Sequence, residues 1–163
     1  MGHRLGIVIL GLALWNARLP PQAFADGVTV IAGTREGRTG DDPNEAVVNE
    51  PFATAFDSTG RLWGVEFTRA NRLFRIQREG PGSDSRPSFV AGVFHRADPQ
   101  RPEPVEGAGD AEGVRFNGLH DLAIGPDDTV YLADTFNHRV RAFDPKSRRL
   151  RTIAGTGVAG DLG

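Results

Sequence analysis

Hydrophobic residues along this chain fall in short runs that are separated by turn-forming residues. Runs such as 52–56 and 119–124 are followed by Asp-Ser-Thr-Gly and Gly-Pro-Asp-Asp, which favour tight turns because glycine tolerates positive φ and aspartate side chains bond nearby backbone. After residue 26, no long window holds an apolar stripe at the helical period of about 3.6 residues. The pattern therefore predicts an all-β protein with few helices.

The runs also recur along the chain. Three similar segments end in Ala-Gly, at Gly33, Gly92 and Gly155, and these glycines are 59 and 63 residues apart. Between them, residues 52–66 resemble residues 119–134. Self-similarity at such a period is typical of propellers, solenoids and other repeat arrays. We therefore expect two copies of one structural unit.

Each copy divides into four short strands, which predicts four-stranded antiparallel sheets. The expected strands are 52–56, 61–66, 72–77 and 88–91 in the first unit, and 119–124, 129–133, 138–143 and 150–154 in the second. Long linkers rich in glycine, proline and acidic residues, 34–51 and 93–118, precede the two units. Because long loops in compact domains are often functional, the linkers are the expected place for chemistry specific to one unit.

The turn after the second strand of the second unit carries a distinctive motif. Residues 131–141 read Tyr-Leu-Ala-Asp-Thr-Phe-Asn-His-Arg-Val-Arg, which resembles the signature of the NHL repeat family. A degenerate version in the first unit has Glu66 in place of the aspartate, one inserted residue, and then Asn71-Arg72. The resemblance extends over 28–163 and implies a β-propeller, in which four-stranded blades pack around a central channel.

Counting blades predicts an incomplete ring. Residues 28–32 are expected to form an orphan closing strand, 52–92 blade one, 119–155 blade two, and 156–163 the start of a loop towards a further blade. Propellers typically have about 4–8 blades, so two cannot close a ring. We expect either a fragment of a longer product or self-assembly of several copies, and we favour the fragment.

The first 25 residues resemble a secretory signal peptide. A basic start is followed by an uncharged apolar run, Leu5 to Trp15, and then by a polar stretch ending in Ala-Phe-Ala25. This is the order of an exported and cleaved segment, and we predict cleavage after Ala25. An uncleaved membrane anchor is the alternative, although the apolar run is shorter than the roughly 20 residues that a spanning helix needs. The expected location is a bacterial periplasm or the exterior, with residues 26–163 as the mature protein.

Composition narrows the chemistry further. The chain has no cysteine, which excludes disulfides, thiolate metal sites and a cysteine nucleophile. Its net charge is −2, and removing the signal would take away two arginines and no acid, so nucleic acid is not an expected partner. Basic residues do concentrate near one predicted hairpin, where we interpret them as outward charges that protect a sheet edge, with an anionic partner as the alternative. They are Arg139, Arg141, Lys146, Arg148, Arg149 and Arg151.

The repeat signature contains residue types that also serve in active sites. A histidine and a carboxylate can ligate a divalent metal, and an aspartate can orient water. Aspartate and asparagine also stabilise turns through their own hydrogen bonds, and a neighbouring arginine can pair with a carboxylate. Because these residues belong to the repeat itself, we interpret them as structural. They are Glu66 and Asn71 in the first unit, and Asp134, Asn137, His138 and Arg139 in the second.

His120 and Asp121 depart from the repeat, because the first unit has Ala53-Thr54 at the place that we match to them. The start of an innermost propeller strand lies near the channel mouth, so this pair is a candidate for ligand binding, for metal ligation or for general base chemistry. Acidic residues in the linkers are a second candidate, for calcium, but they lack EF-hand spacing, and we favour the interpretation that they belong to a solvated linker. These are Glu36, Asp41, Asp42 and Glu45, and then Glu103, Glu106, Asp110 and Glu112. No cofactor is evident, and calcium or zinc is the candidate metal.

These observations favour a binding or interaction module over an enzyme. We identify no catalytic residue and expect an extracytoplasmic, non-enzymatic NHL-repeat module that presents a propeller face to a protein or a small molecule. A signal that is cleaved leaves no transmembrane segment. The alternative is part of a metal-dependent, lactonase-like or lyase-like propeller enzyme, which would need ligands from several blades.

Overall fold

The protein is described by a computed structural model over residues 47–76, 87–103 and 109–160. Apart from one short 3-10 helix, all of its regular elements there are strands, which confirms the all-β prediction. The elements are β1 (Pro51–Phe56), β2 (Leu62–Glu66), β3 (Leu73–Ile76), β4 (Pro87–Ala91), β5 (Gly109–Asp110), β6 (Leu119–Ile124), β7 (Val130–Asp134), η1 (Thr135–Asn137), β8 (Arg139–Asp144) and β9 (Arg149–Ala154).

The expected signal segment, 1–25, and the expected closing strand, 28–32, lie outside the described residues. In the ranges that the structure covers, no helix has the length and apolar character needed to cross a membrane.

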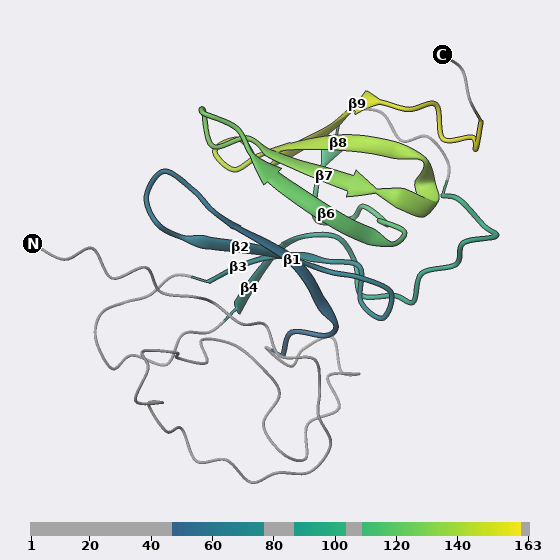
Figure 1. Ribbon diagram of the computed structural model, residues 1–163, viewed down its shortest axis with the longest axis horizontal. Coiled ribbons are helices and arrows are strands. Elements are labelled where there is room, and N and C mark those ends of the chain that lie inside the picture. The colour runs from purple at the N-terminus through teal and green to yellow at the C-terminus, as the bar shows by residue number, and fades with distance from the viewer. Residues whose placement is uncertain (1–46, 77–86, 104–108, 161–163) are drawn as a thin grey trace, which may run out of the picture.

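The strands form two antiparallel sheets, shown in Figure 1 in blue to teal and in green to yellow. The first sheet, blade one, has the order β1-β2-β3-β4, and the second, blade two, has the order β5-β9-β8-β7-β6. Each predicted strand overlaps one of the observed strands. Two meandering sheets of this kind are propeller-type blades, as the repeat pattern predicts.

The linker between the blades adds a fifth strand to blade two. Gly109 and Asp110 of β5 pair with Leu150 and Arg149 of β9. This short strand covers part of the outer edge of blade two, which would otherwise present unpaired backbone groups. The linker thus contributes to the sheet that follows it.

The two blades share their irregularities as well as their strands. In the β1–β2 pairing the register shifts between Pro51 and Ala53, and in the β6–β7 pairing it shifts between Leu119 and Asp121. Phe52 and His120 are therefore the bulged residues of equivalent positions. A bulge redirects the side chains around it, so the repeat places one side chain of each blade in the same special environment.

The recurring Ala-Gly at the end of each fourth strand has a steric reason. Gly92 and Gly155 have φ of 89° and 86°, which favours glycine. A Cβ at Gly92 would lie 2.6 Å from the carbonyl oxygen of Asn71, and a Cβ at Gly155 would collide with the carbonyl of His138. Asn71 and His138 themselves are left-handed, with φ of 54° and 51°. Without a side chain, the glycine at the end of the fourth strand can therefore contact the backbone of the turn that precedes the third strand.

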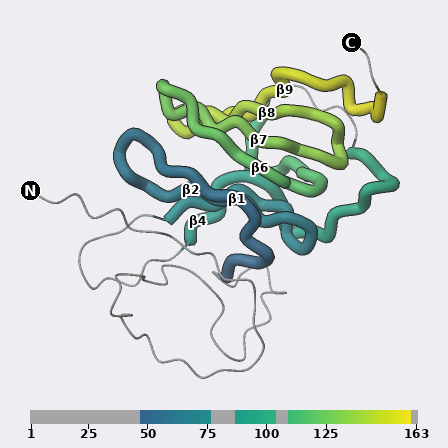
Figure 2. Tube along the Cα trace, in the orientation of Figure 1, coloured from purple at the N-terminus to yellow at the C-terminus, as the bar shows by residue number. Residues whose placement is uncertain are grey.

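The hydrophobic core lies between the blades and joins them. Strand β6 lies beside β1 and β2 (Figure 2), and Trp63 of β2 lies 6.1 Å from Phe143 of β8, measured between ring centroids. Phe116, just before β6, is fully buried in the same core. Full burial of one large apolar side chain stabilises a folded protein by about 1.5–3 kcal/mol. Both sheets contribute such side chains to this core, so the two blades stabilise each other. The core residues include Trp63, Val65, Leu73, Val90, Phe116, Leu119, Val130, Leu132, Phe143 and Leu150.

Candidate functional site

Glu66, the acidic signature residue of blade one, is fully buried at the end of β2. Its carboxylate accepts two hydrogen bonds from Arg72, from Nε at 2.6 Å and from Nη2 at 3.0 Å. It also accepts the backbone N–H of Asn49 at 2.6 Å. Burial raises the pKa of Glu66, and the bonds and charge of Arg72 oppose that shift. The guanidinium in turn lies 3.5 Å from the ring centroid of Phe89.

Asp134 occupies the equivalent place in blade two and is also fully buried. It accepts the backbone N–H of Asn117 at 2.8 Å and the side-chain amide of Asn137 at 3.0 Å. Arg141 Nη1 lies 3.6 Å from Asp134 Oδ2. Burial raises the pKa of Asp134, and the bonds from Asn117 and Asn137 and the charge of Arg141 oppose that shift. The carboxylate therefore fastens the residues that lead into β6.

Three buried asparagines hold the linker between the blades in place. Asn71 donates to the carbonyl of His95 and accepts the N–H of Gly118, and so joins blade one to the start of blade two. Asn117 accepts the N–H of Asp98 and donates to its carbonyl, both at 2.8 Å. Asn137 accepts the N–H of Glu103. In its described parts, the linker is thus a hydrogen-bonded element of the fold.

The sequence match between Asn71 and Asn137 does not hold at the level of the backbone. The left-handed position before the third strand is Asn71 in blade one but His138 in blade two. Asn137 lies one residue earlier, in η1. The left-handed residue is the fifth after Glu66 but the fourth after Asp134, so one inserted residue aligns Asn71 with His138 and not with Asn137. Asparagine tolerates the left-handed conformation better than most residues.

Two residues of the basic group are inside the molecule, which corrects our interpretation of them as outward charges. Arg139 and Arg141 are 5% and 1% exposed. Arg139 donates to the backbone carbonyl of Glu103, and its charge opposes the rise in the pKa of Asp134. Arg141 Nη1 lies 3.6 Å from the carboxylate of Asp134. The reason is the register: residues 139 and 141 pair with Asp134 and Leu132, on the core side of the sheet.

His120 and Asp121, the candidates for ligand binding, are both exposed at the start of β6. The match of His120-Asp121 to Ala53-Thr54 was wrong. The strand pairing in the two blades shows that His120 is equivalent to Phe52 and Asp121 to Ala53. The His120 ring stacks on Phe52, with centroids 4.5 Å apart and an interplanar angle of 30°. The carboxylate of Asp121 accepts the N–H of Leu122.

The sequence analysis missed the aromatic partners of His120. Phe52 lies 4.8 Å from Phe67 and Phe67 lies 5.3 Å from His120, measured between centroids. Phe136 lies 6.1 Å from Phe67. The only signal in the sequence was an aromatic ring at the bulge position of each unit, and reading it required the correct register. We call these four residues, Phe52, Phe67, His120 and Phe136, the aromatic cluster.

The structure describes only some of the acidic residues that are candidates for calcium ligation. Within 47–76, 87–103 and 109–160, no group of three or more of these side chains converges as a metal site would. Of the candidate calcium ligands, Glu103 pairs with Arg115 at 2.8 Å and Glu112 pairs with Arg148. Asp110 accepts the N–H of Glu112. Glu36, Asp41, Asp42, Glu45 and Glu106 lie outside the described residues.

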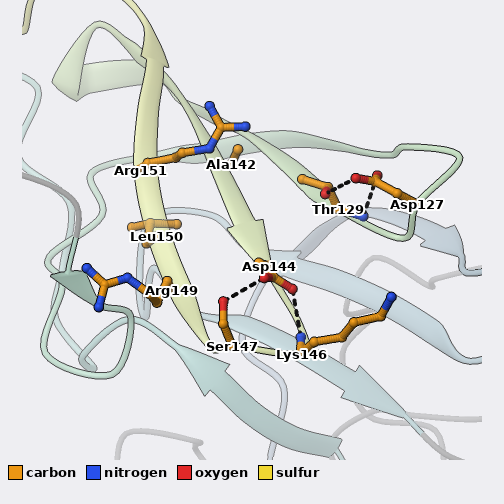
Figure 3. Close-up of a pocket in the computed structure, with 9 residues that line it drawn as sticks. All are labelled: Asp127, Thr129, Ala142, Asp144, Lys146, Ser147, Arg149, Leu150 and Arg151. Carbon is orange, nitrogen blue, oxygen red and sulfur yellow. Dashed lines mark hydrogen bonds between the residues drawn. The ribbon is translucent and has the colours of Figure 1, made fainter.

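A pocket of about 440 Å³ lies at β8, β9 and the turns beside them, and Figure 3 shows the residues that line it. Its two carboxylates are engaged in local turns. Asp127 accepts two bonds from Thr129, and Asp144 accepts bonds from Ser147 Oγ and the N–H of Lys146. These bonds lower the pKa of both carboxyl groups. The pocket is lined by Asp127, Thr129, Ala142, Asp144, Lys146, Ser147, Arg149, Leu150 and Arg151.

Comparisons with known proteins agree with the repeat geometry. The family model described as NHL repeat matches residues 116–143, which include β6, β7, η1 and most of β8. Human NHL repeat-containing protein 2 is 39% identical over 158 residues, or 91% of this chain, and its bovine counterpart is 26% identical over 136 residues, or 80%. The Arabidopsis thaliana protein SUPPRESSOR OF QUENCHING 1, chloroplastic, is 39% identical over 67 residues, or 39% of this chain.

The chain spans only a small part of these relatives. It aligns with 21% of the human protein, 18% of the bovine protein and 6% of the Arabidopsis protein. The agreement is therefore between repeats, and it coincides with the buried carboxylate, the asparagine turn and the four-stranded sheet described above. Together, the matched segment and the two equivalent blades show that this chain belongs to the NHL repeat family.

Proposed function

We propose that this chain is an exported protein-interaction module, whose blades present a surface to a partner outside the cytoplasm. The proposal has two parts. Interaction is supported by the membership in a repeat family and by the distribution of side chains on the blades. Export is supported by the sequence of residues 1–25, with cleavage after Ala25.

The observation that carries the interaction part is the contrast between the signature residues and the aromatic cluster. Glu66, Asp134 and Asn137 are buried, and their polar atoms are bonded within the fold. Phe52 and His120 lie at the same repeat position and are exposed. Solvent-exposed rings gathered from two blades are a typical feature of an interaction surface, where aromatic residues are enriched.

The export part is tested by expressing the full chain with a C-terminal tag in a bacterium and fractionating the cells. We expect the tagged protein in the periplasm or the medium, with an N-terminus at Asp26. A product that stays in the cytoplasm and begins at residue 1 would refute export.

The interaction part is tested by cross-linking the tagged chain in living cells and identifying the attached proteins by mass spectrometry. A matched sample of the tag alone is the control. We expect a protein that is cross-linked reproducibly to the blades and absent from the control. If purified candidates then show no binding to the chain in solution, the interaction function is refuted.

A further inference from the structure

The aromatic cluster is built by the repeat, one pair of rings from each blade. In each blade, the bulge at the start of the inner strand supplies one ring, Phe52 or His120. The turn after the second strand supplies the other, Phe67 or Phe136. The first three of these rings form a compact triangle with centroids 4.5 to 5.3 Å apart. The cluster therefore crosses the junction between the blades at one end of their inner strands.

The cluster is open to solvent although its rings touch. Phe52 is 51% exposed, and His120 is exposed as well. Contacts between the rings stabilise each pair by less than full burial of a phenylalanine would. Phe56, at the other end of β1, is 57% exposed but has no ring partner among the described aromatic pairs. Stacked and exposed rings are thus a specific property of this end of the blades.

Two carboxylates accompany the rings. Glu50 precedes β1, accepts the N–H of Phe67 through its backbone carbonyl, and accepts the hydroxyl of Thr68 through its side chain at 2.6 Å. Its side chain is 43% exposed and lies 3.5 Å from Arg69 Nε. Asp121 follows His120 directly and is exposed. The faces of phenylalanine rings are also electronegative, so the rings and the two carboxylates favour a positively charged ligand.

We propose that the aromatic cluster, with Glu50 and Asp121, is the docking site for an arginine side chain of a partner protein; this inference rests on the proposed interaction function. A guanidinium is planar and weakly hydrated, so it stacks on aromatic faces while its N–H groups bind carboxylates. The molecule already uses this chemistry internally, because Arg72 stacks on Phe89 while it pairs with Glu66. An incoming guanidinium would share Glu50 with Arg69 and add a charged partner to Asp121, whereas a neutral apolar group would desolvate both carboxylates and add no partner.

The test uses the purified full chain and two small probes. N-acetyl-arginine methylamide is titrated into the protein, and the aromatic NMR resonances are followed. The matched probe is N-acetyl-citrulline methylamide, which has nearly the same shape but no charge. We expect the arginine probe to shift the resonances of Phe52, Phe67 and His120 and to bind about three- to fivefold more tightly than the citrulline probe.

Substitutions locate the site. Phe52→Leu and Phe67→Leu each remove one ring and are expected to weaken binding of the arginine probe about threefold. Phe56→Leu is the matched control, because it removes an equally exposed ring from the same strand. Its affinity should equal that of the wild type. If Phe52→Leu does not fold, the comparison of the two probes on the wild-type chain still decides the question.

Several outcomes would overturn the inference. The first is that the arginine and citrulline probes bind with equal affinity. The second is that neither probe shifts the NMR resonances of the aromatic cluster. The third is that Phe52→Leu and Phe56→Leu change the affinity for the arginine probe by the same factor. Failure here is distinguishable from failure of the proposed function. If a cross-linked partner binds the Phe52→Leu/Phe67→Leu variant as tightly as the wild type, the interaction function stands and the docking site lies elsewhere. If no partner binds the wild-type chain, the function itself is refuted.

Discussion

Blade one and blade two place a fully buried carboxylate at the same point of the repeat and stabilise it differently. In blade one, Glu66 forms two hydrogen bonds with Arg72. In blade two, Asp134 accepts hydrogen bonds from the neutral amide of Asn137, and its nearest cation, Arg141, lies 3.6 Å away. Both acids accept a backbone N–H from the residue 17 positions earlier, Asn49 or Asn117.

This comparison shows which interaction of the buried acid both blades have and which one differs between them. The bond to the incoming backbone is present in both blades, so it is the common task of the acid: it fixes the chain just before the inner strand. The counter-group varies between an arginine and an asparagine. A buried carboxylate costs free energy unless it is paired, and either group offsets that cost.

The largest expected effect is at the charged pair of blade one. Glu66→Gln leaves Arg72 buried without its counter-charge, and breaking such a pair costs about 3–5 kcal/mol. Urea unfolding of the variant, followed by tryptophan fluorescence, measures this loss. A loss of less than about 1 kcal/mol in the free energy of unfolding would mean that Arg72 finds another partner in the variant, and that the Glu66–Arg72 pair is not essential to the stability of blade one.

A smaller effect is expected for Asp134→Asn in blade two. The new amide could still accept the N–H of Asn117, but it would also set one NH2 group against that of Asn137. An unsatisfied buried polar group costs about 1–3 kcal/mol. Arg141 would also lose its carboxylate, but that ion pair is looser, at 3.6 Å against 2.6 Å for Arg72 and Glu66. The same unfolding experiment should therefore rank Glu66→Gln above Asp134→Asn, and the opposite order would contradict the comparison.

The first turns of the blades provide a third test, through pH. Burial raises the pKa of Asp57, but bonds from Trp63, Thr59 and Arg61 outweigh it and hold that pKa well below the ordinary value of 3.8. Because the folded-state pKa is lowered, the charged group stabilises the protein above pH 3.8, and this stabilisation is lost as the pH falls below it. Blade two has Gly125 at this place.

We therefore expect Asp57→Asn to destabilise the protein by about 1–2 kcal/mol at pH 7 and by less as the pH falls below 4. Urea midpoints of wild type and variant between pH 7 and pH 3 measure the difference. Asp127→Asn in the exposed turn of blade two is the control and should leave the urea midpoint nearly unchanged at every pH. A difference for Asp57→Asn that stays constant with pH would show that its charge is not the cause.

The smallest effect is expected at the surface of the linker. Glu112 pairs with Arg148, and both side chains are largely exposed. Exposed pairs contribute about 0–1 kcal/mol, so Glu112→Gln should leave the urea midpoint nearly unchanged. A larger loss, close to that of Asp134→Asn, would mean that the linker is fastened to blade two by this pair as well as by its asparagines.

Much of the architecture was predictable because it depends on local chemistry. Turn residues and short apolar runs indicated the strands, and the repeated Ala-Gly reflects a left-handed glycine that no other residue replaces easily. The signature residues predicted a turn, and Asp134 and Asn137 do bond across it. The position of Arg141 beside Asp134 was not predicted, because it depends on which face of β8 meets the core.

By itself, the sequence determined the all-β class, the two repeats and the family. Strand length, turn chemistry and the short signature all depend on residues that are close together in the sequence. Only the tertiary structure decided which side chains meet across the repeats. The matching of His120 to Phe52 depends on a one-residue bulge, and a shift of one residue moves a side chain to the other face of a sheet. The aromatic cluster exists because two such bulges lie side by side at the junction of the blades.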